Sequence, residues 1–413
     1  MYEKVMLWAT PAFIVLMLAE CLVARLRRVG EYRLADAVTS VGLGALSTYV
    51  GVFARLLSFG AYLFVYRHAR LTTLDAGAWW VWVAALVGYD FLYYWYHRLG
   101  HEVNLLWAAH VVHHQSEDYN LSTALRQTSS SYLLSWLFYL PLALAGVPPE
   151  LFLTVSLVDL LYQFWIHTEQ IRTLGAFDRI FASPSNHRVH HAVNDLYVDR
   201  NYGGILILWD RLFGTFQPEL ASVPCVYGTR DPLRSWNPLW ANLHTYAALG
   251  RDAVGTRTWA DKLRVFLRRP GWRPADVAAR FPKPGFRLPL AKYAPPLPRA
   301  LGLYCLAQFV AVLAFGSHFL AVEPALGRPA ALGYFAALAA SLWVIGGLAE
   351  GRAGFARLEA LRLALLAGLA AGAGASAGIA VPPPIVPLAV AGCAMMAAWL
   401  FLAARSLPAA AAP

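Results

Sequence analysis

The fold and the chemistry of this chain depend on residues 79–114, WWVWVAALVGYDFLYYWYHRLGHEVNLLWAAHVVHH. An aromatic, apolar run long enough for a membrane helix leads directly into five histidines within eighteen residues. Imidazole nitrogens at a membrane boundary need partners, because a buried polar group without one is costly. The stretch therefore predicts a membrane span that delivers a group of imidazoles to the boundary between lipid and water.

The composition is that of an integral membrane protein. Of the 413 residues, 58% are hydrophobic and only 14% are charged, which leaves too little polar surface for an ordinary soluble globule. The net charge of +10 suits anionic phospholipid headgroups, and no motif for reading nucleic acid accompanies it. The four cysteines are scattered without a CxxC pair, so any metal site must use nitrogen and oxygen ligands.

Nine segments are long and apolar enough to be candidate spans of a bilayer about 30 Å thick. They cover about residues 5–26, 38–66 (bent near Arg55), 77–96, 131–147, 150–167, 300–322, 330–349, 361–381 and 384–404. Arginines 25, 27, 28 and 33 place the end of the first span in the cytoplasm, and alternation returns His97 and His167 to that side. We therefore predict an all-α fold, a polytopic membrane helical bundle with a histidine-rich di-metal site at the cytosolic face.

The distribution of charge predicts two domains. Residues 1–298 form a membrane domain whose long basic segment, from residue 168 onward, makes a cytosolic cap. Residues 299–413 form a C-terminal transmembrane helical lobe rich in alanine and glycine, which allows close helix packing. The lobe is expected to act as a scaffold, and a direct part in lipid binding is the alternative.

Eight of the twelve histidines fall into three motifs: one HxxxH and two HxxHH. They are His97 and His101, then His110, His113 and His114, then His187, His190 and His191. Spacings of three and four place the side chains of each motif on one helix face. His167, at the end of the fifth span, is a ninth candidate. Three histidines are excluded by position: His68 on the opposite side, His244 in a loop and His318 in the C-terminal lobe.

Metal coordination explains these motifs better than ordinary core packing, which is the usual role of a single buried histidine. Protonated, the imidazoles would repel one another, and neutral, they would lack partners. Zinc sites use about four ligands and iron sites rarely more than about six, so two ions are indicated. Imidazole suits zinc, iron or copper, but a site facing unactivated hydrocarbon needs a redox metal and dioxygen, which favours iron.

The three histidine motifs between membrane spans resemble those of the fatty acid hydroxylase and sterol desaturase superfamily of membrane di-iron enzymes. More narrowly, the surrounding sequence is similar to the alkylglycerol monooxygenase family over about residues 35–245. That similarity lies in YWYHRLGHEVNLLWAAHVVHHQSEDYNLSTALRQ (94–127), FWIHTEQIRTLGAFDRIFASPSNHRVHH (164–191) and DRNYGGILILWDRLFGTF (199–216).

The resemblance implies that the clustered histidines are ligands of two iron ions and that the chain is an O2-dependent monooxygenase of lipids. In that family the ether-bearing carbon of an alkylglycerol is hydroxylated, and the hemiacetal breaks into a fatty aldehyde and glycerol. Tetrahydrobiopterin is the reductant there, and a ferredoxin-like protein is the alternative electron donor here. Hydroxylation or desaturation of a sterol-like, carotenoid or fatty acyl lipid remains a second possibility. A membrane metal transporter would instead spread its histidines across the bilayer.

Two acidic residues are candidates for a catalytic role. Glu102 directly follows His101 and matches an acidic residue that is functionally important in the family, although a solvated charge at a helix end would look the same. Asp90 lies seven residues before His97, on the same helical face, and is predicted to hold a ligand imidazole from behind. An acid within a membrane helix is expensive enough to suggest such a use.

Polar residues after the second motif suggest a pocket. In SEDYNLSTALRQ (116–127), the residues Glu117, Asp118, Asn120 and Arg126 would line a headgroup or pterin pocket, or cap an interfacial helix. The composition, rich in alanine and arginine, indicates GC-rich coding. It therefore suggests a bacterial inner membrane, with the active site facing the cytoplasm.

Overall fold

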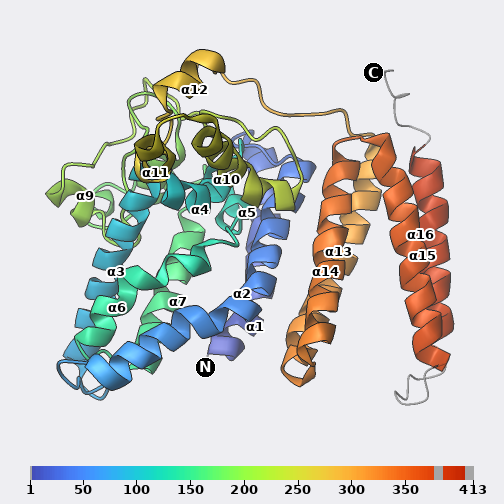
Figure 1. The fold of residues 1–413 in the computed structure, drawn as a ribbon, viewed down its shortest axis with the longest axis horizontal. Helices are drawn as coiled ribbons and strands as arrows, with labels where there is room; N and C mark the ends of the chain where they lie inside the picture. Colours follow the sequence, from blue (N-terminus) through green and yellow to red (C-terminus); the bar gives the residue numbers. More distant parts are fainter. Residues whose placement is uncertain (1, 376–384, 405–413) are drawn as a thin grey trace. The chain divides into compact units, whose positions relative to one another are not determined.

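The computed structural model describes residues 2–375 and 385–404, and its regular structure there is helical apart from two isolated bridges (Figure 1). The all-α prediction is therefore confirmed. The chain divides into two compact units, one of Met1–Leu233 with Ala241–Lys292 and one of Arg234–Trp240 with Tyr293–Pro413.

The first unit contains five long helices and a set of shorter elements. The long helices are α1 (Tyr2–Arg27), α2 (Leu34–Ala69), α3 (Trp79–Glu102), α7 (Pro149–Trp165) and α10 (Pro238–Gly255), the last of which begins in the segment Arg234–Trp240 of the second unit. The shorter elements are α4 (Asn104–His114), α5 (Leu121–Ala124), η1 (Ser131–Leu133), α6 (Trp136–Leu144), η2 (Phe177–Arg179), α8 (Pro184–His191), α9 (Leu208–Leu212), α11 (Trp259–Leu267) and α12 (Ala275–Arg280). In Figure 1 helix α2 changes direction partway along its length.

Three helices of the described chain are long and apolar enough to cross a membrane. These segments are Leu34–Ala54, Arg299–Ala325 and Arg328–Ala349. The chain is thus an integral membrane protein with several candidate spans, as predicted. The predicted span at 131–147 is wrong, because this segment forms η1 and the nine-residue helix α6. Nine residues rise only about 14 Å, roughly half of the hydrocarbon thickness.

Helix α3 presents different faces to the protein and to its surroundings. Trp79 and Val83 are exposed, whereas Val81, Ala85 and Tyr89 are buried. The buried face packs with α6 and α7 in one apolar cluster, in which the rings of Tyr89 and Tyr139 stack 4.6 Å apart. This packing fixes the orientation of α3 and therefore the position of its last two turns.

The second unit consists of α13 (Arg299–Val322), η3 (Glu323–Ala325), α14 (Arg328–Ala349), α15 (Ala353–Ala375) and α16 (Ile385–Ala404). The predicted spans 361–381 and 384–404 fall on α15 and α16, with residues 376–384 outside the described residues. A buried polar group centred on Glu359, which accepts hydrogen bonds from Tyr304 and Arg362, links α13 and α15.

Candidate metal centre

The nine predicted histidines come from four places in the first unit. The end of α3 supplies His97 and His101, α4 supplies His110, His113 and His114, α8 supplies His187, His190 and His191, and His167 follows α7. Helix α8 begins where its motif requires, because Pro184 occupies the first turn and the Ser183 side chain accepts from the Asn186 amide.

The fold gathers all nine histidines into two clusters. The five-histidine cluster contains His97, His101, His110, His114 and His190. The four-histidine cluster contains His113, His167, His187 and His191. Within each cluster the candidate ligand atoms lie within 4.8 Å of one another, which is the spacing expected around a shared ion.

The two clusters are neighbours, because α4 and α8 each contribute to both. The rings of His114 and His191, one from each cluster, stack with centroids 4.3 Å apart. Inside the clusters the Nε2 atoms converge, as between His97 and His110 at 3.2 Å and between His187 and His167 at 3.0 Å. This arrangement can hold two ions side by side.

Backbone carbonyls fix the orientation of four of these imidazoles through Nδ1. The Nδ1 contacts are His97 to Tyr202 O (2.7 Å), His113 to Arg126 O (3.0 Å), His167 to Gln163 O (2.7 Å) and His190 to Arg200 O (3.0 Å). A carbonyl can only accept, so in each case Nδ1 carries the proton and donates it. The lone pair of Nε2 then faces the cluster, as a metal ligand requires.

Burial keeps the imidazoles of α4 and α8 neutral. It lowers the pKa of His113 to about 4, and neighbouring imidazoles add to this effect elsewhere. The pKa values of His110, His114, His187, His190 and His191 are lowered well below the usual value for the same reason. Neutral imidazole is the form that binds a metal ion.

Some of the clustered imidazole nitrogens have no hydrogen-bond partner. Among the described residues, the buried Nε2 atoms of His101 and His190 form no hydrogen bond. Both belong to the five-histidine cluster, and a buried nitrogen without a partner is unfavourable. Two clusters of converging, neutral and partly unpaired nitrogens fit two metal ions, which is the kind of site that the sequence predicted.

The three excluded histidines lie outside both clusters. His68 is exposed at the end of α2, and His318 contacts Tyr334 in the second unit. The prediction that His244 lies in a loop is wrong: it lies in α10, where its Nδ1 is 3.3 Å from the Gln115 side chain. Its exclusion from the metal site still agrees with the geometry.

Asp90 acts on the site indirectly. It accepts hydrogen bonds from the backbone amides of Ile205 and Leu206 and from the Trp209 indole. The predicted contact with His97 is not formed, because the Nδ1 of His97 donates to the Tyr202 carbonyl. Asp90 thus fixes the segment after residue 202, and that segment orients the imidazole.

Glu102 lies beside the five-histidine cluster and pairs with cations. Its carboxylate is 3.1 Å from Arg98 and 3.6 Å from Arg269, and its side chain is partly exposed. The carboxylate that approaches the cluster is Asp199, whose Oδ1 lies 3.5 Å from the Nδ1 of His101. A catalytic role for Glu102 remains a prediction.

Three further acids support the site and were not singled out in the sequence. Asp210 accepts from the amides of Tyr202 and Gly203, and Asp159 lies against Gly204, so both brace the segment that orients His97. Asp210 is the one acid in the largely apolar run ILILWDRLF (205–213), a signal that could have identified it. The sequence around Asp199 contains no such signal. Its position depends on a backbone turn in which Asp199 itself has a φ of 60°.

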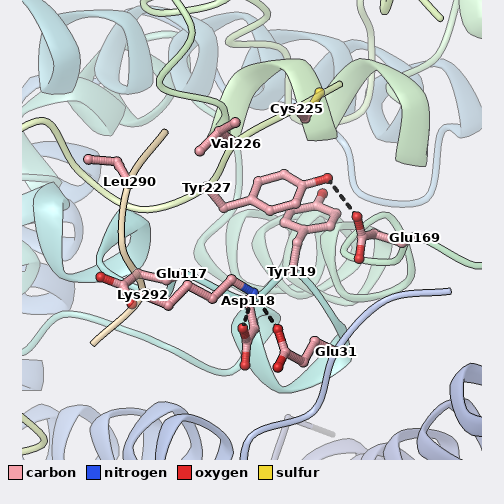
Figure 2. A pocket seen from close by; sticks show the side chains of 10 residues that line it. All are labelled: Glu31, Glu117, Asp118, Tyr119, Glu169, Cys225, Val226, Tyr227, Leu290 and Lys292. Atoms are coloured by element: carbon pink, nitrogen blue, oxygen red, sulfur yellow. Dashed lines mark hydrogen bonds and ion pairs between the residues drawn. The ribbon is translucent and has the colours of Figure 1, made fainter. Parts of the chain in front are cut away.

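A cavity of about 240 Å³ is lined by residues that include Tyr119, Tyr227 and Lys292 (Figure 2). Its wall includes the stacked rings of Tyr119 and Tyr227, 4.8 Å apart, and Tyr119 also stacks on His167 at 5.7 Å. Glu117 and Asp118, two of the four polar residues predicted to form a pocket, line this cavity. Of the other two residues predicted there, Asn120 caps α5 and Arg126 is buried beside α2 and α4.

Comparison with known proteins defines the class of this site. Residues 82–215 match the family model described as Fatty acid hydroxylase. The match begins in α3 and extends beyond α9, so it contains all nine clustered histidines. No solved structure matches the chain.

Relatives that align with most of this chain identify its family more closely. The chain is 39% identical to the alkylglycerol monooxygenase of Homo sapiens over 360 residues, covering 86% of this chain and 80% of that protein. It is 37% identical to the alkylglycerol monooxygenase of Danio rerio, covering 87% of this chain and 80% of that protein. It is 35% identical to the alkylglycerol monooxygenase of Xenopus tropicalis, covering 86% of this chain and 80% of that protein. The chain therefore belongs to the alkylglycerol monooxygenase family.

Proposed function

We propose that this chain is a di-iron monooxygenase that cleaves the ether bond of membrane alkylglycerols by hydroxylating the ether-bearing carbon. The observation that carries the proposal is the convergence of nine histidines into two adjoining buried clusters in a member of this family. An almost all-imidazole donor set retains the positive charge of its metal ions, which favours binding of an oxygen-derived ligand.

The residues of the chain hold and orient the centre. The five-histidine and four-histidine clusters would each hold one ion, with Tyr202, Arg126, Gln163 and Arg200 carbonyls fixing four imidazoles. When bound, iron supplies the redox chemistry with dioxygen that an unactivated C–H bond requires. Asp90 and Asp210 keep the segment behind His97 in place.

The proposed reaction balances with an external reductant. The ether-bearing CH2 group, dioxygen, two electrons and two protons give a carbon bearing a hydroxyl group, and one water. The resulting hemiacetal then loses its C–O bond to give a fatty aldehyde and free glycerol. Tetrahydrobiopterin is the donor proposed from the family, and a ferredoxin-like protein is the alternative.

The proposed membrane orientation places both clusters at the cytoplasmic face, because the arginines after α1 favour that side. The compared relatives are vertebrate proteins, so they do not support a bacterial inner membrane. A bacterial location rests on composition alone.

The reaction can be tested with membranes that contain the protein and an alkylglycerol labelled in its alkyl chain. We expect labelled fatty aldehyde to appear only with dioxygen and a donor, with separate arms for tetrahydrobiopterin and for a reduced ferredoxin. A His113→Ala variant inserted in the same membranes is the matched control, since it lacks one candidate ligand. Turnover of a sterol, carotenoid or fatty acyl lipid without any aldehyde would reject ether cleavage in favour of the second possibility.

A further inference from the structure

Helix α11 carries large apolar side chains on its exposed side. Trp259, Leu263 and Leu267 are 81%, 69% and 67% exposed. A spacing of four residues places them along one face of the helix. On the other side, Val265 is buried against Ala108 of α4. The helix is thus anchored to the protein by one face and presents a second apolar face outward.

The position of α11 is fixed next to the end of α3. Asn104 follows α3 by two residues, and its amide donates to the Arg268 carbonyl at 2.8 Å. Its side chain donates to the Val265 carbonyl at 2.8 Å. The exposed apolar face of α11 therefore lies near the point where α3 ends.

The charges around this face are mostly positive. Arg257, Arg264, Arg268 and Arg269 are exposed within or beside the helix. Lys262 lies over the Trp259 ring at 5.6 Å, and the one acid of the helix, Asp261, pairs with Arg264. An apolar stripe with a terminal tryptophan and basic flanks is the composition of a helix that lies in the headgroup layer.

We infer that α11 is an interfacial helix whose face of Trp259, Leu263 and Leu267 enters the headgroup layer of a bilayer containing anionic phospholipid. Lipid burial removes these side chains from water, and the arginines contact lipid phosphates. Because α11 is hydrogen bonded to the start of α4, membrane docking also supports the helix that carries His110, His113 and His114. The inference goes beyond the proposed reaction and does not depend on it.

The position of the face can be measured by spin labelling of the full chain in nanodiscs. The four native cysteines are first replaced by serine, and Leu263→Cys is labelled with a nitroxide. The matched control is Ala279→Cys, an exposed position on α12, the helix drawn above α11 in Figure 1. Collisions with lipid-soluble oxygen and with a water-soluble nickel chelate are then compared. Trp259→Cys serves as a second reporter if the first variant does not insert.

The inference predicts that the label at residue 263 is reached by oxygen and protected from the chelate in anionic nanodiscs, whereas the label at 279 is open to the chelate. Loss of this protection in purely zwitterionic nanodiscs is expected as well. Equal chelate access at both positions would overturn the inference. Dipolar broadening between labels at 263 would also overturn it, because the face would then be a contact between two copies of the chain.

Discussion

Several buried side chains stabilise the geometry of the metal centre through more than one hydrogen bond, and Arg126 is the clearest example. It is 1% exposed and donates to the Val112 carbonyl at 2.8 Å and to Ser40 at 3.2 Å. Its guanidinium lies 3.5 Å from Asp36, and its own carbonyl accepts from His113. The residue thus joins α2, the end of α4 and one imidazole.

Replacing Arg126 should therefore destabilise the first unit strongly. Arg126→Met leaves the Asp36 carboxylate buried without its cation, and loss of one partner of such a pair lowers the free energy of unfolding by about 3–5 kcal/mol. Denaturant unfolding in detergent would measure the loss, and Asp36→Asn in the same chain should recover part of it. The exposed Arg251→Met is the control, expected to change stability by less than about 0.5 kcal/mol. Equal effects of the two single variants would contradict this role.

The effect of replacing a histidine on iron content and turnover should depend on whether that histidine belongs to a cluster. His113→Ala removes one nitrogen from the four-histidine cluster, so we expect loss of turnover and a lower iron content in protein that still inserts into membranes. His244→Ala is a matched control, because this histidine lies outside both clusters and should leave the iron content unchanged. The two variants are compared by mass spectrometry of metals. Full iron content in His113→Ala would remove His113 from the metal shell.

Close packing between helices and loops supports the metal centre, most clearly where residues 202–210 contact α3 and α7. A Cβ atom added at Gly204 would lie 2.8 Å from the Asp159 Oδ1 and 2.8 Å from the Tyr93 ring. Gly204→Ala should destabilise the protein by about 1–3 kcal/mol through overpacking. It should also lower turnover, because Tyr202 in the same segment orients His97.

The matched control is Gly250→Ala in α10, where an added Cβ meets no atom of the described residues within 4 Å. Alanine favours helix over glycine by up to about 1 kcal/mol, so this change should be neutral or stabilising. Thermal unfolding in detergent compares the two variants. A Gly204→Ala protein as stable and active as the Gly250→Ala protein would show that the segment tolerates displacement.

The elements also show where hydropathy alone misleads. Residues 131–147 are apolar enough to resemble a span, yet Ser130 and Ser131 open a turn, Gly146 takes a φ of 85°, and α6 between them is short. Its partners are α2 and α3, so apolar side chains such as Tyr139 and Leu142 are buried within the protein, whereas Leu137 is exposed. Burial within a bundle and exposure to lipid require the same side chains, and a sequence window does not distinguish them.

Across the whole molecule, the pattern of histidines was the most informative part of the sequence. Spacings of three and four on helices predicted to end at one layer indicated that the eight motif histidines would meet, and the structure brings them together with His167. The layer of His167 was predicted with a span at 131–147 that is not formed. The division into five and four, and the carbonyls that orient them, could not be predicted. They depend on loops such as residues 199–206, in which the Ile205 amide donates to Asp90 and the Tyr202 amide donates to Asp210.

The centre should also contribute to the stability of the folded protein. Converging buried nitrogens favour a bound ion, and a ligand at about 1,000 times its dissociation constant stabilises the folded state by about 4 kcal/mol. Chelation should therefore lower the unfolding temperature, and ferrous iron should restore both stability and turnover. Zinc is the control, expected to restore stability without turnover because it has no redox chemistry. An unfolding temperature that is indifferent to chelation would contradict a structural contribution of the metal.

The central claim is that the two histidine clusters hold a pair of iron ions. Its most direct measurement is the metal content per chain of folded, membrane-extracted protein from cells supplied with iron, taken together with turnover of the same sample. We predict about two iron ions per chain, one for each cluster of four or five imidazoles. Active protein that contains no iron, or only one metal ion per chain, would contradict the claim.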